Sequence, residues 1–215
     1  MTFATPKINF WCKRPIGYED ANATTCWSYE NSSKPCTEFE YDHSFYWSTI
    51  IEEFNLVCDR SWFASLAASI FQIGYGVSSI FMGMLSDKYG RLVALKTAVV
   101  LELVSGVSMA LSRTIYEYLL ARFFLGIGCY ARFLTGLLLI LEILGPKHRD
   151  RIRVFTESAW CLSLLLLPII YYVVPHFRYV QLGVSAYELL FVYWLWTNVP
   201  ESPRWQLSEC GLIKW

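Results

Sequence analysis

Five long apolar segments occupy most of the chain after residue 60. They cover 62–85, 92–111, 118–144, 154–174 and 179–199, and short polar stretches separate them. About 20 predominantly apolar residues in a helix cross the hydrocarbon core of a bilayer. Each segment is therefore predicted to be a membrane-spanning helix, with a kink expected at Pro168. The pattern predicts an all-α membrane protein.

The first 60 residues are polar, rich in aromatic side chains and irregular in pattern. They hold two acceptor triplets for N-glycosylation, which begin at Asn22 and Asn31. They also hold four cysteines, which are candidates for disulfide bonds: Cys12, Cys26, Cys36 and Cys58. Four cysteines allow three pairings, and the sequence does not choose among them. Together these features indicate an oxidising, extracellular environment.

The distribution of Lys and Arg predicts the orientation in the membrane. The 83–91 stretch, the 145–153 stretch and the C-terminal residues hold most of the bases that lie between or after the apolar segments. The positive-inside rule places these three regions in the cytoplasm. We therefore expect an extracellular domain over 1–60, a membrane domain over 61–199 and a cytoplasmic segment over 200–215.

The stretch Gly83–Arg91 contains two glycines, one acid and two bases, and we expect it to form a short loop at a membrane face. It resembles the signature between the second and third helices of the major facilitator superfamily. Three further segments resemble the organic cation, organic anion and carnitine transporters of that superfamily. These segments are Glu53–Cys58 with Ser61 and Trp62, Pro175–Tyr179 with Gln181 and Leu182, and Pro200–Trp205.

This resemblance implies a fold of twelve helices in two halves, of which the five spans would be helices two to six. The chain is then expected to be the N-terminal half-bundle of a longer protein in the plasma membrane. Its expected partners are a small organic ion, the bilayer, the missing first helix and the missing second half. The implied function is alternating-access secondary transport, with an organic cation or a carnitine-like substrate favoured. Alternatives are an organic anion porter, a sugar porter, or a truncated membrane glycoprotein that transports nothing.

The resemblance also implies a conformational role for Gly83–Arg91. In the superfamily this loop holds the two halves together in the outward-open state, and its charges pair with a neighbouring helix end. The residues expected to form such a latch are Gly83, Asp87, Gly90, Arg91, Glu142 and Arg149. The alternative is that the bases only orient the chain and the glycines only permit a turn.

Ionisable residues inside the apolar segments are a further signal. Glu102, Arg132 and Glu188 fall near the middle of their spans, where charge is costly and tends to face a cavity or an opposite charge. The resemblance places a substrate cavity at Tyr130, Arg132, Phe133, Leu137, Leu141, Glu157 and Trp160. Aromatic rings with a carboxylate suit a cation. Arg132 favours an anion unless it pairs with Glu157 or Glu102, and ion pairs that only join helices are the alternative.

Other residue types argue against catalysis. The three histidines lie far apart in the sequence, so no metal site is expected. No nucleophile elbow and no phosphate-binding loop with lysine is present in the sequence, so neither an enzyme nor a cofactor is expected. Five glycines are expected to allow close contact between helices: Gly74, Gly76, Gly126, Gly128 and Gly136.

Overall fold

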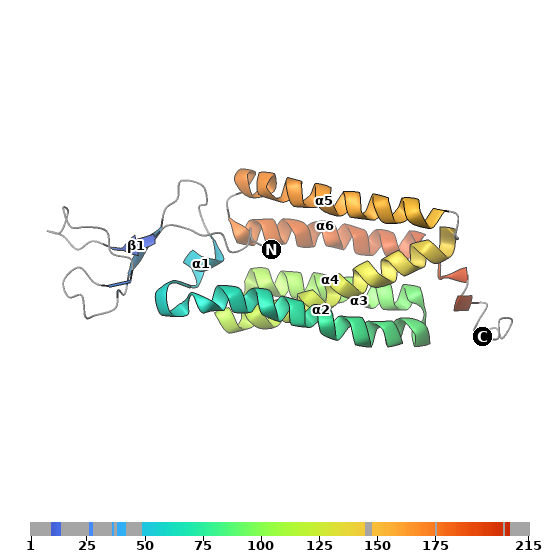
Figure 1. The fold of residues 1–215 in the computed structure, drawn as a ribbon, viewed down its shortest axis with the longest axis horizontal. Coiled ribbons are helices and arrows are strands. Elements are labelled where there is room, and N and C mark those ends of the chain that lie inside the picture. Colours follow the sequence, from blue (N-terminus) through green and yellow to red (C-terminus); the bar gives the residue numbers. More distant parts are fainter. Residues whose placement is uncertain are drawn as a thin grey trace. The chain divides into compact units, whose positions relative to one another are not determined.

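The computed structural model describes residues 10–13, 26–27, 36, 38–41, 49–144, 148–174, 176–203 and 205–206. Five long helices dominate these residues (Figure 1). They are α2 (Trp62–Tyr89), α3 (Arg91–Leu111), α4 (Ile115–Leu144), α5 (Arg149–Val173) and α6 (Phe177–Asn198). Each predicted apolar segment coincides with one helix, which confirms the predicted all-α class.

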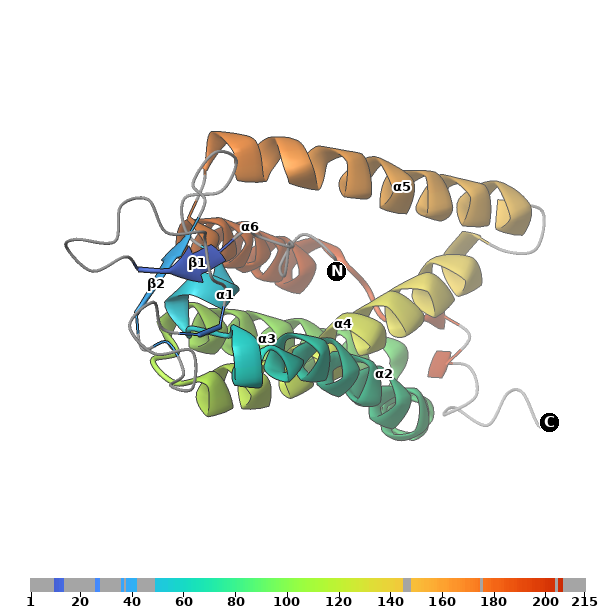
Figure 2. The same ribbon diagram turned by 60° about the vertical axis from the view of Figure 1, so that its left-hand side comes forward.

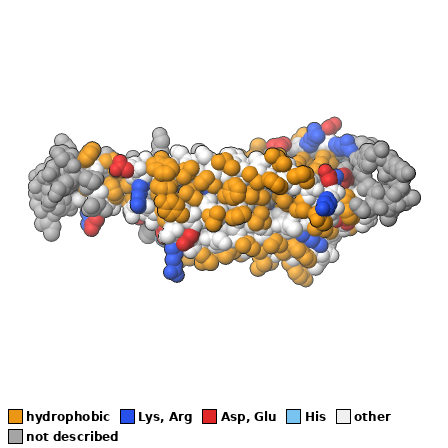
Figure 3. Space-filling model, turned by 90° about the horizontal axis from the view of Figure 1, so that it is seen from below, with side chains coloured by type: hydrophobic (Ala, Val, Ile, Leu, Met, Phe, Trp, Pro, Cys, Tyr) orange, Lys and Arg blue, Asp and Glu red, His pale blue; other side chains and the backbone are white. Residues whose placement is uncertain are grey.

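Four of these helical regions are long and apolar enough to cross a membrane, within the part of the chain that the structure describes. They are Cys58–Tyr89, Arg91–Leu111, Ile115–Leu144 and Arg149–Ile170. The fifth helix, α6, has 22 residues and is long enough, but its Tyr and Trp side chains together with Glu188 lower its mean hydropathy. Hydrophobic side chains cover the helical part of the face in Figure 3, and charged side chains flank them.

The chain divides into two structural units. The first contains Met1–Ala68 and Leu167–Val180, and the second contains Ser69–Leu166 and Gln181–Trp215. The start of α2 and parts of α5 and α6 thus group with the N-terminal residues. The predicted boundaries at 60/61 and 199/200, with their extracellular and cytoplasmic assignments, remain predictions.

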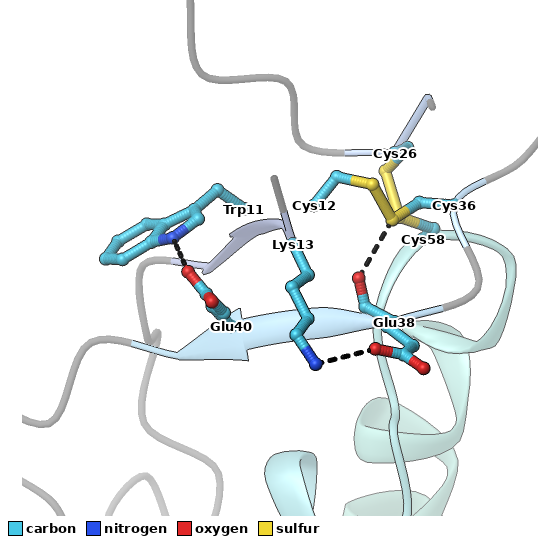
Figure 4. Close-up of a disulfide and its surroundings, with 8 residues drawn as sticks. All are labelled: Trp11, Cys12, Lys13, Cys26, Cys36, Glu38, Glu40 and Cys58. Carbon is cyan, nitrogen blue, oxygen red and sulfur yellow. Dashed lines mark hydrogen bonds and ion pairs between the residues drawn. A yellow bond between two sulfur atoms is a disulfide. The ribbon is translucent and has the colours of Figure 1, made fainter. Parts of the chain in front are cut away.

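Two disulfides and a short antiparallel strand pair stabilise the first unit. Strand β1 (Phe10–Cys12) pairs antiparallel with β2 (Phe39–Tyr41). Disulfides join Cys12 to Cys36 and Cys26 to Cys58, as Figure 4 shows, so one of the three possible pairings is now defined. Asn22 and Asn31 lie outside the described residues.

A short helical segment follows in the same unit. Helix α1 (Ile50–Glu53) is capped by Thr49, whose hydroxyl accepts a hydrogen bond from the backbone N–H of Glu52. A 3₁₀ turn, Cys58–Arg60, then leads to α2. Across the unit, Arg178 donates a 2.8 Å hydrogen bond to Glu53.

Small residues set the helix contacts in the second unit. A Cβ atom at Gly126 of α4 would collide with the backbone oxygen of Phe71 on α2. A Cβ at Gly74 would lie 2.5 Å from the backbone oxygen of Phe123, and one at Gly128 would lie 2.9 Å from the backbone nitrogen of Glu102. These three glycines therefore permit close packing as predicted. A Cβ at Gly136 would make an ordinary van der Waals contact with Leu95 of α3 at 3.8 Å, and one at Gly76 would meet no atom of the described residues within 4 Å, so neither glycine is required for close packing there.

Helices α3 and α4 lie side by side in both ribbon views (Figures 1 and 2). A cluster of buried side chains joins them to α6 through Leu95, Val99, Leu139 and Leu195. This packing brings the first half of α3 beside the last turns of α4 and α6. Ionisable side chains buried between these helices must find partners inside the helical layer.

The predicted loop at Gly83–Arg91 is wrong for most of its length. Helix α2 continues through Tyr89, and α3 begins at Arg91, so Gly90 alone separates the two helices. The residues Met84–Tyr89 include no proline or glycine and can extend the helix. Gly90 ends it because its φ of +101° is a backbone conformation that side-chain-bearing residues rarely adopt.

Candidate functional site

Three ionisable side chains from three helices meet in the second unit. Arg132 of α4 lies between Glu102 of α3 and Glu188 of α6, and we call these three residues the intramembrane cluster. The Arg132 Nε atom lies 2.6 Å from Glu102 Oε2, and Arg132 Nη2 donates a 3.1 Å hydrogen bond to Glu102 Oε1. The same Nε atom lies 3.9 Å from Glu188 Oε1. Of the two partners considered from the sequence, Arg132 therefore pairs with Glu102.

The cluster has more acid than base. Two carboxylates surround one guanidinium, and the Cys129 thiol donates a 3.3 Å hydrogen bond to Glu102 Oε1. Glu188 is only 4% exposed. Arg132 cannot balance both acids, so the cluster attracts positive charge.

Aromatic rings accompany these charges. Tyr75 of α2 packs against Tyr130 of α4 with ring centroids 5.3 Å apart, and it also contacts Phe71 at 4.8 Å. Tyr75 interacts electrostatically with Glu102 and with Arg132. A face that combines aromatic rings with excess carboxylate can hold an organic cation.

The other residues predicted for the cavity lie on α4 and α5, and several of them are exposed. Leu137 and Leu141 are half-buried on α4, whereas Phe133 is exposed. Glu157 and Trp160 lie on α5, where both side chains are exposed. The structure therefore brings Tyr130 and Arg132 into one site with Glu102, and it does not bring the α5 residues into contact with Arg132 among the described residues.

A second charged site lies where α2 meets α3. Arg91 forms an ion pair with Asp87, and its Nε atom lies 3.4 Å from Glu142 Oε1 of α4. Arg91 also donates a 3.2 Å hydrogen bond to the hydroxyl of Ser86, which is buried. We call Asp87, Arg91 and Glu142 the Arg91 network.

The residues after α6 complete this site, although sequence reasoning gave them no role in it. Ser202 Oγ donates a 2.6 Å hydrogen bond to Glu142 Oε2. Glu201 Oε1 accepts a 2.9 Å hydrogen bond from the backbone N–H of Leu92 and so caps the start of α3. The sequence signal was the Pro200–Trp205 motif itself, which places an acid and a hydroxyl directly after a span.

Two residues predicted for the latch are not part of the contact. Arg149 is exposed at the start of α5 and, among the described residues, makes no bond to Asp87 or Glu142. Gly83 lies within α2 and has open space beside it. The geometry thus keeps Asp87, Gly90, Arg91 and Glu142 together.

These two sites lie in a chain whose residues 21–211 match the family model for "Sugar (and other) transporter". The chain belongs to this transporter family. Members of the family are membrane transporters, so the chain is an integral membrane protein and not an enzyme.

Relatives within this transporter family carry more specific names. The human protein "Solute carrier family 22 member 2" is 36% identical over 162 residues, which are 75% of this chain and 29% of the relative. The Drosophila melanogaster "Organic cation transporter-like protein" is 32% identical over 179 residues, or 83% of this chain and 31% of the relative. These matches confirm the resemblance to organic cation transporters. The chain spans about a third of the length of such relatives.

Solved structures confirm the major facilitator fold for this family member. The proton:xylose symporter XylE, bound to 6-bromo-6-deoxy-D-glucose, aligns with a TM-score of 0.64 at 24% identity and covers 70% of this chain. The alignment covers 38% of the symporter. A second structure, of a D-xylose-proton symporter, gives a TM-score of 0.61 at 24% identity. At this identity the likeness shows the fold alone.

Proposed function

We propose that this chain is part of a secondary transporter of small organic ions, with an organic cation as the favoured substrate. One observation carries the preference for a cation: the intramembrane cluster places two carboxylates around a single guanidinium. The names of the two Drosophila melanogaster relatives that are called organic cation transporters support the same substrate class.

The aromatic side chains fit this substrate. Tyr75 packs against Tyr130 and interacts electrostatically with Glu102, and a cation over an aromatic face gains about 0.5–2 kcal/mol. An organic cation would also find less competition from Arg132, because Glu102 engages the guanidinium through both carboxylate oxygens. We include Phe133, Leu137, Leu141, Glu157 and Trp160 in the proposed cavity, with α5 supplying its wall in the complete transporter.

We further propose that the five long helices are helices two to six of a longer transporter. A first helix and a second half would complete the cavity, because alternating access requires two halves that rock about a central site. The greater length of the relatives supports this architecture. In the plasma membrane, residues 1–60 would be extracellular and glycosylated at Asn22 and Asn31, with the C-terminal residues in the cytoplasm.

The Arg91 network would act as the conformational latch. Arg91 joins the end of α2 to the end of α4, and Ser202 joins α4 to the residues after α6. A network of this kind can hold one state of the transporter and open in the other. Arg149 is a further base near these helix ends. It would join the latch when the complete protein changes between its conformational states.

The test is uptake by cells that express the longer protein containing this chain. Radiolabelled organic cations, organic anions and sugars are offered at equal concentrations, and cells that do not express the protein give the background. We expect saturable uptake of the cation. Saturable sugar uptake without cation uptake would instead favour a sugar porter. This chain expressed alone is expected to give no saturable flux.

A further inference from the structure

Lys96 is a base inside an apolar helix, and neither functional site uses it. It lies about 8 Å along α3 from Arg91, the first residue of the helix, and it is partly buried. Its ammonium group lies over the ring of Trp196 on α6, with Nζ 5.1 Å from the ring centroid. No acid among the described residues forms an ion pair with Lys96. An aromatic face therefore covers this charge without neutralising it.

The acids at the same end of α3 are already engaged. Asp87 and Glu142 pair with Arg91, and Glu201 accepts hydrogen bonds from two backbone N–H groups. A positive charge within a membrane-spanning helix is stabilised by an opposite charge or by reaching the headgroup layer. The described side chains do not supply the opposite charge for Lys96, so the bilayer is the source to consider.

The geometry directs Lys96 towards a membrane face. Side chains on a helix tilt towards its N-terminus, which for α3 lies at Gly90. Trp196 lies in the last turn of α6, and the residues after that helix contact the start of α3 through Glu201. Both side chains therefore lie near the same membrane face, where tryptophan is typically found.

Exposed apolar side chains continue from this pair towards the middle of both helices. They share a helix face with Lys96 or with Trp196, because they lie three, four, seven or eight positions away. Together they form an apolar stripe beside a single positive charge. The stripe consists of Val93, Val100 and Val104 on α3, and of Leu189 and Tyr193 on α6.

We propose that Lys96 and Trp196 form a binding site for the phosphate group of an anionic phospholipid in the leaflet next to Gly90. The ammonium group of Lys96 contacts the phosphate, Trp196 holds the ammonium in place, and the apolar stripe contacts the acyl chains. An anionic lipid fits better than phosphatidylcholine, whose own positive charge offsets its phosphate. In the proposed orientation this is the cytoplasmic leaflet, which is the anionic one in plasma membranes.

Native mass spectrometry of the delipidated chain in detergent tests the site. Equimolar phosphatidylglycerol and phosphatidylcholine with the same acyl chains are added, and the bound lipids are distinguished by mass. We expect the chain to retain phosphatidylglycerol preferentially. Lys96→Gln should lower this preference about fivefold, the effect of one lysine at an anionic membrane surface. Lys96→Arg keeps the charge and should keep the preference.

Three controls make the assignment specific, and circular dichroism checks that each variant keeps its helical signal. Lys88→Gln removes the same charge at the end of α2, near the same membrane face, and should leave the preference unchanged. Trp196→Leu should lower the preference about two- to fivefold, because the ammonium loses the aromatic face. Excess inorganic phosphate should not displace the lipid, since it has no acyl chains to contact the stripe.

Several outcomes would overturn the proposal. One is an unsubstituted chain that does not distinguish the two lipids. Another is a preference that survives Lys96→Gln, or one that Lys88→Gln lowers equally, which would indicate unspecific attraction to surface charge. Displacement by inorganic phosphate would indicate a phosphate site and not a lipid site. Each result stands whether or not the complete protein transports organic cations.

Discussion

Ser202 Oγ donates a 2.6 Å hydrogen bond to Glu142 Oε2, which joins two residues that are 60 positions apart. Glu142 uses its other oxygen for Arg91 at 3.4 Å. One carboxylate therefore connects α4 with the α2–α3 junction and with the residues after α6. Because the Ser202 side chain is fully buried, its hydroxyl has no water to bond if this hydrogen bond is lost.

Ser202→Ala should destabilise the second unit by about 1–3 kcal/mol, since the partly buried carboxylate of Glu142 loses a hydrogen-bond donor. Unfolding of the detergent-solubilised chain, followed by circular dichroism during thermal or denaturant titration, measures the loss. Ser163→Ala is the matched control, because Ser163 is exposed and its hydroxyl donates a hydrogen bond to Trp160 O within its own helix. Equal stability of the two variants would contradict the structural role of Ser202.

Asp87→Asn should reduce uptake by the complete protein while leaving the chain folded. The Asp87 side chain is 74% exposed, so its ion pair with Arg91 contributes little to stability in water. A conformational role requires the charge itself, which Asn lacks at nearly the same size. The measurement is initial uptake rate normalised to surface expression, and a rate equal to that of the unsubstituted protein would refute the latch.

The sequence predicted the helices well because membrane spans leave a strong signal. Runs of apolar residues from Trp62 onward have few alternatives once they are about 20 residues long. It failed at the end of α2, where Asp87 and Lys88 looked like loop residues. The polar residues there extend the helix, and only the positive φ of Gly90 ends it.

Only part of the two functional sites could be predicted from the sequence. The signal there was the cost of burying charge, not the length of an apolar run. The ionisable residues Glu102, Arg132 and Glu188 could be singled out because charge is costly at membrane depth. Their mutual distances depend on how α3, α4 and α6 rotate about their axes, which small residues such as Gly128 determine. The Pro200–Trp205 motif singled out the segment that contains Ser202, but it did not identify Glu142 as the partner, because a serine after a span has many possible partners.

Gly126→Ala should destabilise the chain by about 1–3 kcal/mol, because a methyl group would collide with the backbone of α2 at Phe71. Gly76→Ala gives the opposite expectation: the site has open space, and alanine favours the helix. Comparing the unfolding midpoints of both variants with that of the parent chain measures the difference. Similar midpoints for the two alanine variants would contradict the close contact of α2 and α4.

Replacing Cys26 and Cys58 together by serine should destabilise the first unit by about 2–4 kcal/mol, because the disulfide closes a loop with a sequence separation of 32. Limited proteolysis between the two positions should become faster, and mass spectrometry locates the cuts. The four helical regions of membrane-spanning length should keep their helical signal. Cys161→Ser is the control, since that cysteine is free and exposed.

Arg132→Gln should cost more stability than Glu102→Gln, because the two variants leave different charges behind. Without Arg132, two neighbouring acids remain without a base, and losing one partner of a buried pair costs about 3–5 kcal/mol. Since the Arg132 side chain is 38% exposed, we expect a smaller loss of about 2–3 kcal/mol. Without Glu102, Arg132 can turn towards Glu188, which lies 3.9 Å away. The double variant should recover part of the loss of Arg132→Gln, and strictly additive unfolding free energies would show that the pair is not coupled.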